Sequence, residues 1–231
     1  MYGTARSSIS GTLAAMTSTV TDREFAAVLF DNDGTLTDST AAVNRSWSTW
    51  AREFDLELTS LRGYHGVPAA AIVNQLVPQD QQEAALRRIV EIETADTDGV
   101  VALPGAVDAV RAVGVRGAIV TSATRSLAVA RLHAAGLSTP EVMITADDIT
   151  HGKPDPQPFL RAAEALGVSP SDCLVVEDAP SGTTAAHAAG CAVLAVLSTT
   201  AEEDLNAELI VPDLSHVWFV SRAGGVRVRV R

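Results

Sequence analysis

The sequence predicts an α/β protein with a Rossmann-like, three-layer core around a parallel sheet and a small α-helical unit inserted into that core. Short apolar runs with the length of buried strands recur along most of the chain, and segments with helical periodicity separate them. Such alternation is typical of parallel sheets that are covered by helices. One long stretch has helical periodicity and no strand-like run, which predicts the insert. The predicted boundaries are 1–21 for a disordered tail, 22–37 and 101–231 for the core, and 38–100 for the helical insert.

The first predicted strand is the apolar run AAVLF at residues 26–30, which continues directly into the sequence DNDGTLTDS. A short run without polar residues is typical of a strand that is buried on both faces. In α/β proteins, ligands bind in loops at the carboxyl ends of the parallel strands. We therefore expect the acidic residues after this strand to belong to a functional site.

The insert is predicted from apolar side chains that recur every three or four residues, which is the spacing of one helix face. The pattern runs from Ser39 to about Asp98 without a strand-like interruption. The positions that carry it are Val43, Trp47, Trp50 and Phe54 in the first segment, and Ala85, Ile89 and Ile92 in the last.

After the insert, strand-like and helical segments alternate to the end of the core. Gly136 stands where a helix C-cap is expected. The tail at 217–231 alternates apolar and polar residues about Gly224-Gly225, which predicts a terminal hairpin with its arginines facing water. Helices are expected at 105–113, 125–136, 158–167 and ending at 187–190, and strands within 117–123, 142–145, 173–182, 192–196 and 208–214.

The composition argues against several classes of protein. The 231 residues include 28 acidic and 17 basic side chains, a net charge of -11, whereas a nucleic-acid surface needs clustered positive charge. Hydrophobic residues make up 47% of the chain, which is enough for a core and too many for a disordered protein. No apolar run approaches the ~18 residues of a membrane span. We expect a small-molecule partner rather than nucleic acid or a membrane, and a monomer or weak dimer.

The two cysteines, Cys173 and Cys191, are too few for a disulfide scaffold, and each begins an apolar run. Buried, reduced thiols are therefore expected. The first sixteen residues lack the apolar core of a secretory signal. They are typical of a disordered tail, unless translation begins at Met16. Together these observations predict a cytoplasmic protein.

Acidic, hydroxyl and lysine side chains follow the predicted strands and should meet at one edge of the sheet. Closely packed carboxylates repel one another unless a cation lies between them, and Mg²⁺ suits such a site because it binds carboxylates together with phosphate oxygens. One Asp can attack phosphorus, and a second carboxylate can move the proton of the leaving oxygen. The residues are Asp31 and Asp33 after the first strand, Thr121 and Ser122 after a second, Lys153 in the HGKPDP loop, and Glu177 and Asp178 after another.

Lys153 stands out by composition, because the chain has 16 arginines and this single lysine. A compact ammonium fits a crowded carboxylate pocket that the broad, planar guanidinium of an arginine does not fit. The use of lysine at this one position therefore predicts a functional role for Lys153.

Four motifs, taken in order, resemble those of the haloacid dehalogenase superfamily of phosphohydrolases. They are DNDGT at 31–35, Ser122 in VTSAT, Lys153 in GKPDP, and Glu177-Asp178 in VVEDAPSG. The resemblance covers roughly residues 25–215, and the helical insert resembles the small α-helical cap of the family. The sequence is most similar to the subgroup of sugar-phosphate and glycerol-phosphate phosphatases.

By this resemblance, Asp31 is expected to be the nucleophile and Asp33 the general acid and base. Mg²⁺ would be held by the Asp31 carboxylate, the Asp33 main-chain carbonyl and Asp178. Glu177 would act mainly through a metal-bound water, in the outer shell of the metal.

The resemblance also implies a phosphate-binding set. Ser122 and Lys153 would bind the transferring phosphate, and the main-chain amides of Asn32 and Asp33 would help to cradle it. The implied activity is Mg²⁺-dependent hydrolysis of a small phosphomonoester, a sugar or polyol phosphate, through an aspartyl-phosphate.

Substrate choice would depend on the cap. His65 in the turn LRGYHGVP, Arg45 on the first cap helix and Arg125 after the Ser122 loop are candidates for substrate contact. Mutases of the family carry a histidine where Val43 stands, which favours a phosphatase. A mutase that resembles β-phosphoglucomutase is the alternative, and a dehalogenase or a non-catalytic phosphate-binding module ranks below it.

Overall fold

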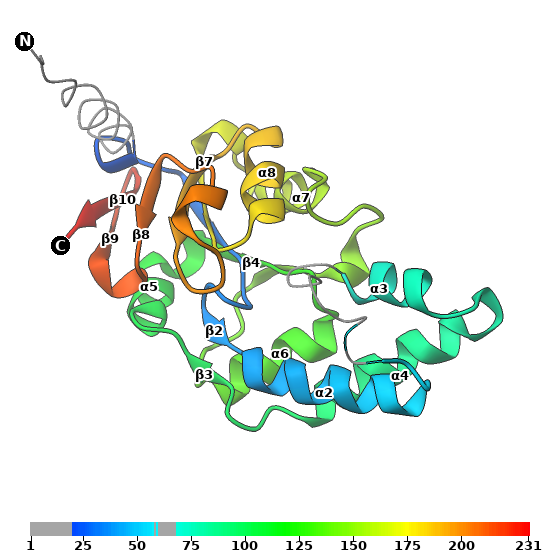
Figure 1. Cartoon of the computed structure of the whole chain (residues 1–231). Helices are drawn as coiled ribbons and strands as arrows, with labels where there is room; N and C mark the ends of the chain where they lie inside the picture. Colours follow the sequence, from blue (N-terminus) through cyan, green and yellow to red (C-terminus); the bar gives the residue numbers. More distant parts are fainter. Residues whose placement is uncertain (1–19, 58, 60–67) are drawn as a thin grey trace, which may run out of the picture.

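The structure of the protein is a computed structural model, which describes residues 20–57, 59 and 68–231. Its core is a six-stranded parallel sheet with the strand order β5-β4-β1-β6-β7-β8 (Figure 1). This is the predicted Rossmann-like arrangement. The strands are β1 (Ala27–Phe30), β4 (Gly117–Val120), β5 (Val142–Ile144), β6 (Cys173–Glu177), β7 (Ala192–Val196) and β8 (Leu209–Val211).

Strand β1 lies in the middle of the sheet, between β4 and β6. All four of its residues are buried, as expected for an apolar strand covered on both faces. Phe30 is paired with Ile119 of β4 and with Val176 of β6. The three strands therefore end at nearly the same level, and the loops that follow them lie next to one another.

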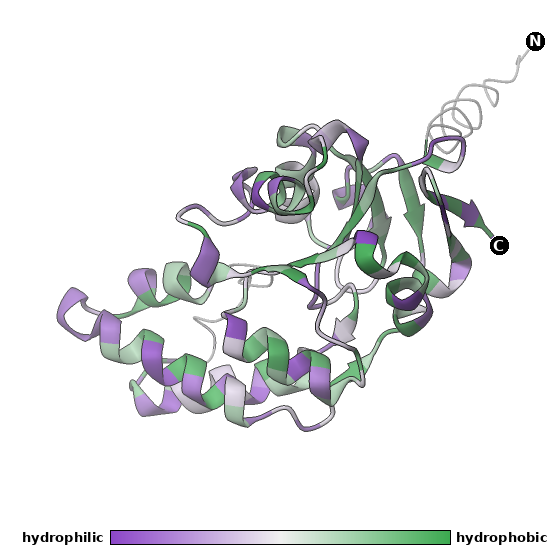
Figure 2. Cartoon of the chain, turned by 180° about the vertical axis from the view of Figure 1, so that it is seen from behind, coloured by the Kyte–Doolittle hydropathy of each residue, from purple (hydrophilic) through white to green (hydrophobic). Residues whose placement is uncertain are grey.

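Alternate residues along the strands point to opposite faces, and each face has its own helical cover. Figure 2 shows the strands largely apolar and the helices banded with polar residues. One face packs against α5 (Ala106–Val113), α6 (Arg125–Ala134) and the hairpin of β9 (Val217–Arg222) and β10 (Gly225–Val230). The other packs against α7 (Gln157–Leu166) and α8 (Pro180–Ala188).

Three helices, α2 (Thr40–Glu53), α3 (Ala69–Leu76) and α4 (Gln82–Ala95), pack around a separate apolar cluster. Trp50 is fully buried in this cluster, and its indole nitrogen donates a hydrogen bond to the Ala85 carbonyl at 2.9 Å. This is the helical region that the periodicity predicts. A two-stranded ribbon of β2 (Thr37–Asp38) and β3 (Val101–Ala102) connects it to the core.

The C-terminal hairpin forms as predicted, but its turn is shifted by one residue. Gly225 already pairs with Arg222, so Ala223 and Gly224 form the loop. Gly225 has a φ of 158° and its backbone packs closely against Phe25, where a side chain would not fit. The β9 and β10 arginines are exposed, as expected. Of the helices in the described part of the chain, none has the length and apolar character of a membrane span.

Candidate active site

Three buried carboxylates meet at the carboxyl edge of the sheet. Asp31 follows β1, Glu177 is the last residue of β6, and Asp178 follows it. One oxygen of each carboxylate lies within 4.8 Å of those of the other two, and all three residues are buried. The neighbouring ends of β1 and β6 thus bring together residues that are nearly 150 positions apart in the sequence.

Lys153 lies between two of these carboxylates. Its Nζ donates to Asp31 Oδ1 at 2.6 Å, to Glu177 Oε1 at 2.7 Å and to the carbonyl of Val120 at 3.0 Å. All three hydrogens of the ammonium therefore have an acceptor. Nζ also lies over the Phe159 ring, 5.1 Å from its centroid.

Burial is the largest single influence on the pKa values of the cluster, and neighbouring charges come second. Burial raises the pKa of Asp31 well above its ordinary value, and Lys153 only partly offsets this rise. Burial and, second to it, the charge of Glu177 together raise the pKa of Asp178 to about 7. For Lys153, burial alone would lower the pKa, but Asp31 and Glu177 outweigh it and the pKa is raised. When all three carboxylates are ionised, they carry more negative charge than one ammonium balances.

Glu177 is held on both sides. While Oε1 accepts from Lys153, Oε2 accepts from the main-chain amides of Asp178 at 2.8 Å and Ala179 at 3.0 Å. Gly182, in the first turn of α8, makes room for it, because any side chain there would overlap the Glu177 carboxylate. Both oxygens of Glu177 are therefore engaged within the protein, which suits a supporting rather than a direct role at a metal.

Asp178 is held by two threonines. Thr35 donates to Oδ1 at 3.1 Å, and Thr199 donates to Oδ2. The left-handed Gly34, with φ of 91°, passes so close that a side chain would overlap the Asp178 carboxylate. Sequence reasoning did not single out Thr35 or Thr199. Thr35 lies inside the DNDGT motif, whereas Thr199 follows β7 in a segment without any local signal.

Asp33 faces a different set of partners. Its Oδ1 accepts from Ser39 Oγ at 2.7 Å and pairs with Arg131 Nη1 at 2.9 Å, and its Oδ2 accepts from the Asn32 side chain at 3.2 Å. Sequence reasoning also missed Arg131, which it treated as part of an ordinary helix. The structure brings this arginine to the second motif aspartate.

The remaining predicted phosphate-binding residues lie at the same edge of the sheet. Ser122 is half-buried directly after Thr121, whose amide donates to Ile144 and whose hydroxyl accepts from the Ala123 amide at 3.1 Å. Asn32 is fully buried, and its Oδ1 has no hydrogen-bond partner among the described residues.

Two of the predicted substrate-contact residues pair with carboxylates that do not belong to this cluster. Arg45 is an exposed residue of α2 that pairs with Asp96 at 2.8 Å. Arg125 pairs with Asp148 at 2.7 Å and donates to the Met143 carbonyl at 2.9 Å. His65 lies outside the described residues. The guanidinium groups of Arg45 and Arg125 thus have structural partners, and their role toward substrate stays a prediction.

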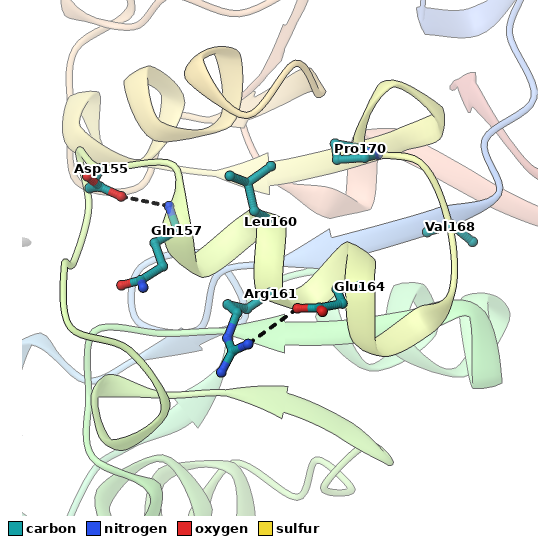
Figure 3. A pocket seen from close by; sticks show the side chains of 7 residues that line it. All are labelled: Asp155, Gln157, Leu160, Arg161, Glu164, Val168 and Pro170. Atoms are coloured by element: carbon teal, nitrogen blue, oxygen red, sulfur yellow. Dashed lines mark hydrogen bonds and ion pairs between the residues drawn. The ribbon is translucent and has the colours of Figure 1, made fainter.

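Two surface hollows formed by residues that the structure describes lie away from the carboxylate cluster. The one in Figure 3 lies along the outer side of α7, where Asp155 accepts from the Gln157 amide at 2.9 Å and Arg161 pairs with Glu164 at 3.3 Å. Its apolar lining comes from Leu160, Val168 and Pro170.

Known proteins that resemble this chain indicate which family this geometry belongs to. The model of the family described as haloacid dehalogenase-like hydrolase matches residues 28–196. The chain belongs to this family. Hexitol phosphatase A of Escherichia coli K12 is 38% identical to it over 205 residues, which cover 85% of this chain and 95% of that protein. This haloacid dehalogenase-like hydrolase is also 31% identical to glycerol-1-phosphate phosphohydrolase 2 of Saccharomyces cerevisiae over 188 residues, covering 75% of each.

A solved structure supports the same assignment. A hydrolase from Pseudomonas syringae superposes with a TM-score of 0.73 at 25% identity, covering 82% of this chain and 94% of that one. The predicted fold class and family are confirmed, and the chain is an enzyme of the hydrolase class.

Proposed function

We propose that this hydrolase is a Mg²⁺-dependent phosphatase that acts on a small phosphomonoester, a sugar or polyol phosphate, through an aspartyl-phosphate on Asp31. The observation that carries the proposal is the buried cluster of Asp31, Glu177 and Asp178 with Lys153 bound between two of them. The named activities of the relatives, a hexitol phosphatase and a glycerol-1-phosphate phosphohydrolase, support the substrate class.

The residues present fit a hard divalent cation. The cluster offers only oxygen ligands, which Mg²⁺ prefers, and burial, followed by the neighbouring carboxylates, raises the pKa of both Asp31 and Asp178. Asp31, the Asp33 carbonyl and Asp178 would hold the ion, with Glu177 in its outer shell. When bound, Mg²⁺ would offset negative charge on the phosphate oxygens and on the attacking carboxylate.

The chemistry would divide between the two motif aspartates. Asp31 attacks phosphorus, a new P–O bond forms, and the bond to the ester oxygen breaks as Asp33 gives that oxygen its proton. Asp33 then takes a proton from water, which attacks the phosphorus of the aspartyl-phosphate and releases inorganic phosphate. The proton lost in the first half of the cycle returns in the second, so the enzyme is unchanged.

Lys153, Ser122 and the amides of Asn32 and Asp33 would hold the transferring phosphate. Lys153 already contacts Asp31 at 2.6 Å, so it can orient the nucleophile and stabilise the charge on the phosphoryl oxygens at the same time. Fixed donors of this kind contribute most of the catalysis in phosphoryl transfer.

Substrate recognition would come from the helical insert, acting as a cap. Arg45, Arg125 and His65 are the proposed contacts, and we expect the first two to exchange their present acidic partners for substrate oxygens where they take part. We also infer a cytoplasmic location, which the two buried, free cysteines support.

The test is a panel of sugar, polyol and nucleotide phosphates assayed for phosphate release with Mg²⁺ and with a chelator. We expect turnover of polyol or sugar phosphates that needs Mg²⁺ and disappears in Asp31→Asn. Arg161→Gln, at an exposed site on α7, is the matched control and should retain activity.

The other outcomes separate the alternatives. Isomerised sugar phosphate seen by NMR would indicate a mutase, and turnover of a haloacid without metal would indicate a dehalogenase. Phosphate binding by a folded protein that turns over nothing in the panel would contradict the proposal.

A further inference from the structure

Arg131 lies in a largely buried ion triad between the core and the helical insert, in which only the Asp33 side chain is partly exposed. It belongs to the core helix α6, and only 6% of its side chain is exposed. Nη1 pairs with Asp33 Oδ1 at 2.9 Å, and Nη2 pairs at 2.9 Å with Oε1 of Glu93, which lies on the insert helix α4. One guanidinium thus connects the proposed acid and base to the insert.

Glu93 is itself firmly placed. Only 7% of its side chain is exposed, and it accepts a further hydrogen bond from Trp47 of α2. Burial raises its pKa, which Arg131 partly offsets. Two insert helices therefore fix the far end of the triad, while Ser39 shares Asp33 Oδ1 with Arg131 at the near end.

A buried ion triad contributes little to the free energy of folding for the desolvation that it requires. Removing charged groups from water carries a penalty that a buried ion pair often fails to recover, so a buried triad is weak support for the fold. It does, however, hold charged groups in one geometry. Among the ion pairs of residues 20–57, 59 and 68–231, the Arg131–Glu93 pair is the one that joins an insert helix to a core helix.

We propose that Arg131 is a positioning residue for Asp33, and that Glu93 makes this positioning depend on the seating of α4 against α6. The inference rests on the proposed function, because it concerns the proton transfer that Asp33 performs. Arg131 itself keeps its protons throughout, since a guanidinium stays charged in proteins. Its contribution is to hold the Asp33 carboxyl group where it meets the leaving oxygen.

The role of Arg131 can be tested with two substrates whose leaving groups differ in reactivity. A purely structural role would not change the ratio of their kcat/KM values. An alkyl phosphate needs its leaving oxygen protonated, whereas p-nitrophenolate leaves well without a proton. A misplaced Asp33 should therefore harm the first substrate far more than the second. In Arg131→Met, we expect kcat/KM for the best alkyl phosphate of the panel to fall about 100-fold. We expect kcat/KM for p-nitrophenyl phosphate to fall less than about tenfold.

Two further variants make the test specific. Glu93→Gln should shift the ratio of the two kcat/KM values in the same direction but less, and adding it to Arg131→Met should cause little further loss. Arg88→Met is the matched control, because Arg88 pairs with Glu53 on the exposed side of the insert. We expect it to leave the ratio unchanged within about twofold.

The outcomes are distinguishable. If the wild type hydrolyses both substrates and Arg131→Met loses both equally, the positioning role is wrong and the proposed function stands. If the wild type hydrolyses neither, the proposed function fails first. Should Arg131→Met fail to fold by circular dichroism, Glu93→Gln carries the test, and an unchanged ratio in that variant overturns the inference.

Discussion

Lys153 shows how much a single side chain contributes to this site. Its ammonium is buried and donates to two carboxylates and a carbonyl at 2.6–3.0 Å. A guanidinium is planar and larger, so it cannot replace a compact ammonium among these three acceptors without displacing Asp31. The single lysine among 16 arginines thus has a structural reason.

We predict that Lys153→Arg lowers kcat by at least about 100-fold, as expected for the loss of a preorganised donor at the reacting charge. Steady-state phosphate release from the best substrate measures it, with melting curves to verify folding. Arg161→Lys exchanges the same two side chains at an exposed site and should stay within about twofold. Full activity in Lys153→Arg would contradict the role given to the ammonium.

The titration of the carboxylates predicts how pH affects metal binding. Asp178 has a pKa of about 7, and the pKa of Asp31 is also raised. Between about pH 4 and pH 7, the metal-free fold therefore holds protons that the unfolded chain has released. Its free energy of unfolding should fall as pH rises through this window.

Mg²⁺ binds the deprotonated carboxylates and competes with these protons. We therefore predict that a fixed, subsaturating concentration of Mg²⁺ raises Tm more at pH 8 than at pH 6. Scanning fluorimetry with and without chelator measures the difference. The same shift at both pH values, or an unchanged shift in Asp178→Asn, would argue against metal binding at this cluster.

At the scale of elements, the start of α8 is shaped around the site. The helix begins at Pro180, two residues after Asp178, and its Gly182 backbone packs against the Glu177 carboxylate. A methyl group at this position would push either the helix or the carboxylate away. The amides of Asp178 and Ala179 and the ammonium of Lys153 would then lose their common acceptor.

We predict that Gly182→Ala lowers kcat by about 100-fold, since displacing Glu177 also shifts Lys153 at the reacting centre, and small displacements there cost this much. Thr184→Ala, an exposed substitution on the same helix, is the control and should have little effect. Measuring kcat and Tm for both variants separates a loss of catalysis from a loss of stability. If Gly182→Ala keeps wild-type kcat, the packing of α8 against Glu177 has no catalytic consequence.

The elements themselves could be predicted because their signals are local. Strand β1 is an uninterrupted apolar run, and the insert helices repeat apolar residues at helical spacing. Asp31, Lys153, Glu177 and Asp178 could be brought together because parallel strands end at one edge. The exact turn of the final hairpin could not, because it depends on the contact between Gly225 and Phe25.

The missed residues depend on contacts between distant segments. Arg131 and Glu93 are 38 positions apart and meet only when α4 packs near α6. A signal was nevertheless present, because each occupies the buried face of its helix. Arg131 shares that face with Leu127 and Leu132, and Glu93 lies one turn after Ile89. A charged residue on an apolar helix face needs a buried partner.

For the whole molecule, the proposed function depends on two units, the sheet core and the helical insert. The parallel sheet supplies the carboxylate cluster. The helical insert is joined to the core by the β2–β3 ribbon and contacts it through the Arg131–Glu93 ion pair. The net charge of -11 does not describe this site, since much of the acidity lies at exposed positions. The division into core and cap at residues 38 and 100 stays a prediction.

The most direct test of the central claim is whether Asp31 becomes phosphorylated during turnover. Wild-type enzyme is mixed with Mg²⁺ and its best phosphomonoester, quenched in acid, and mapped by mass spectrometry of its peptides. The account predicts one added phosphoryl group on the peptide that contains Asp31, and none in Asp31→Asn. Phosphate release at the wild-type rate with no phosphoryl group on that peptide, or with the group on another residue, would contradict it.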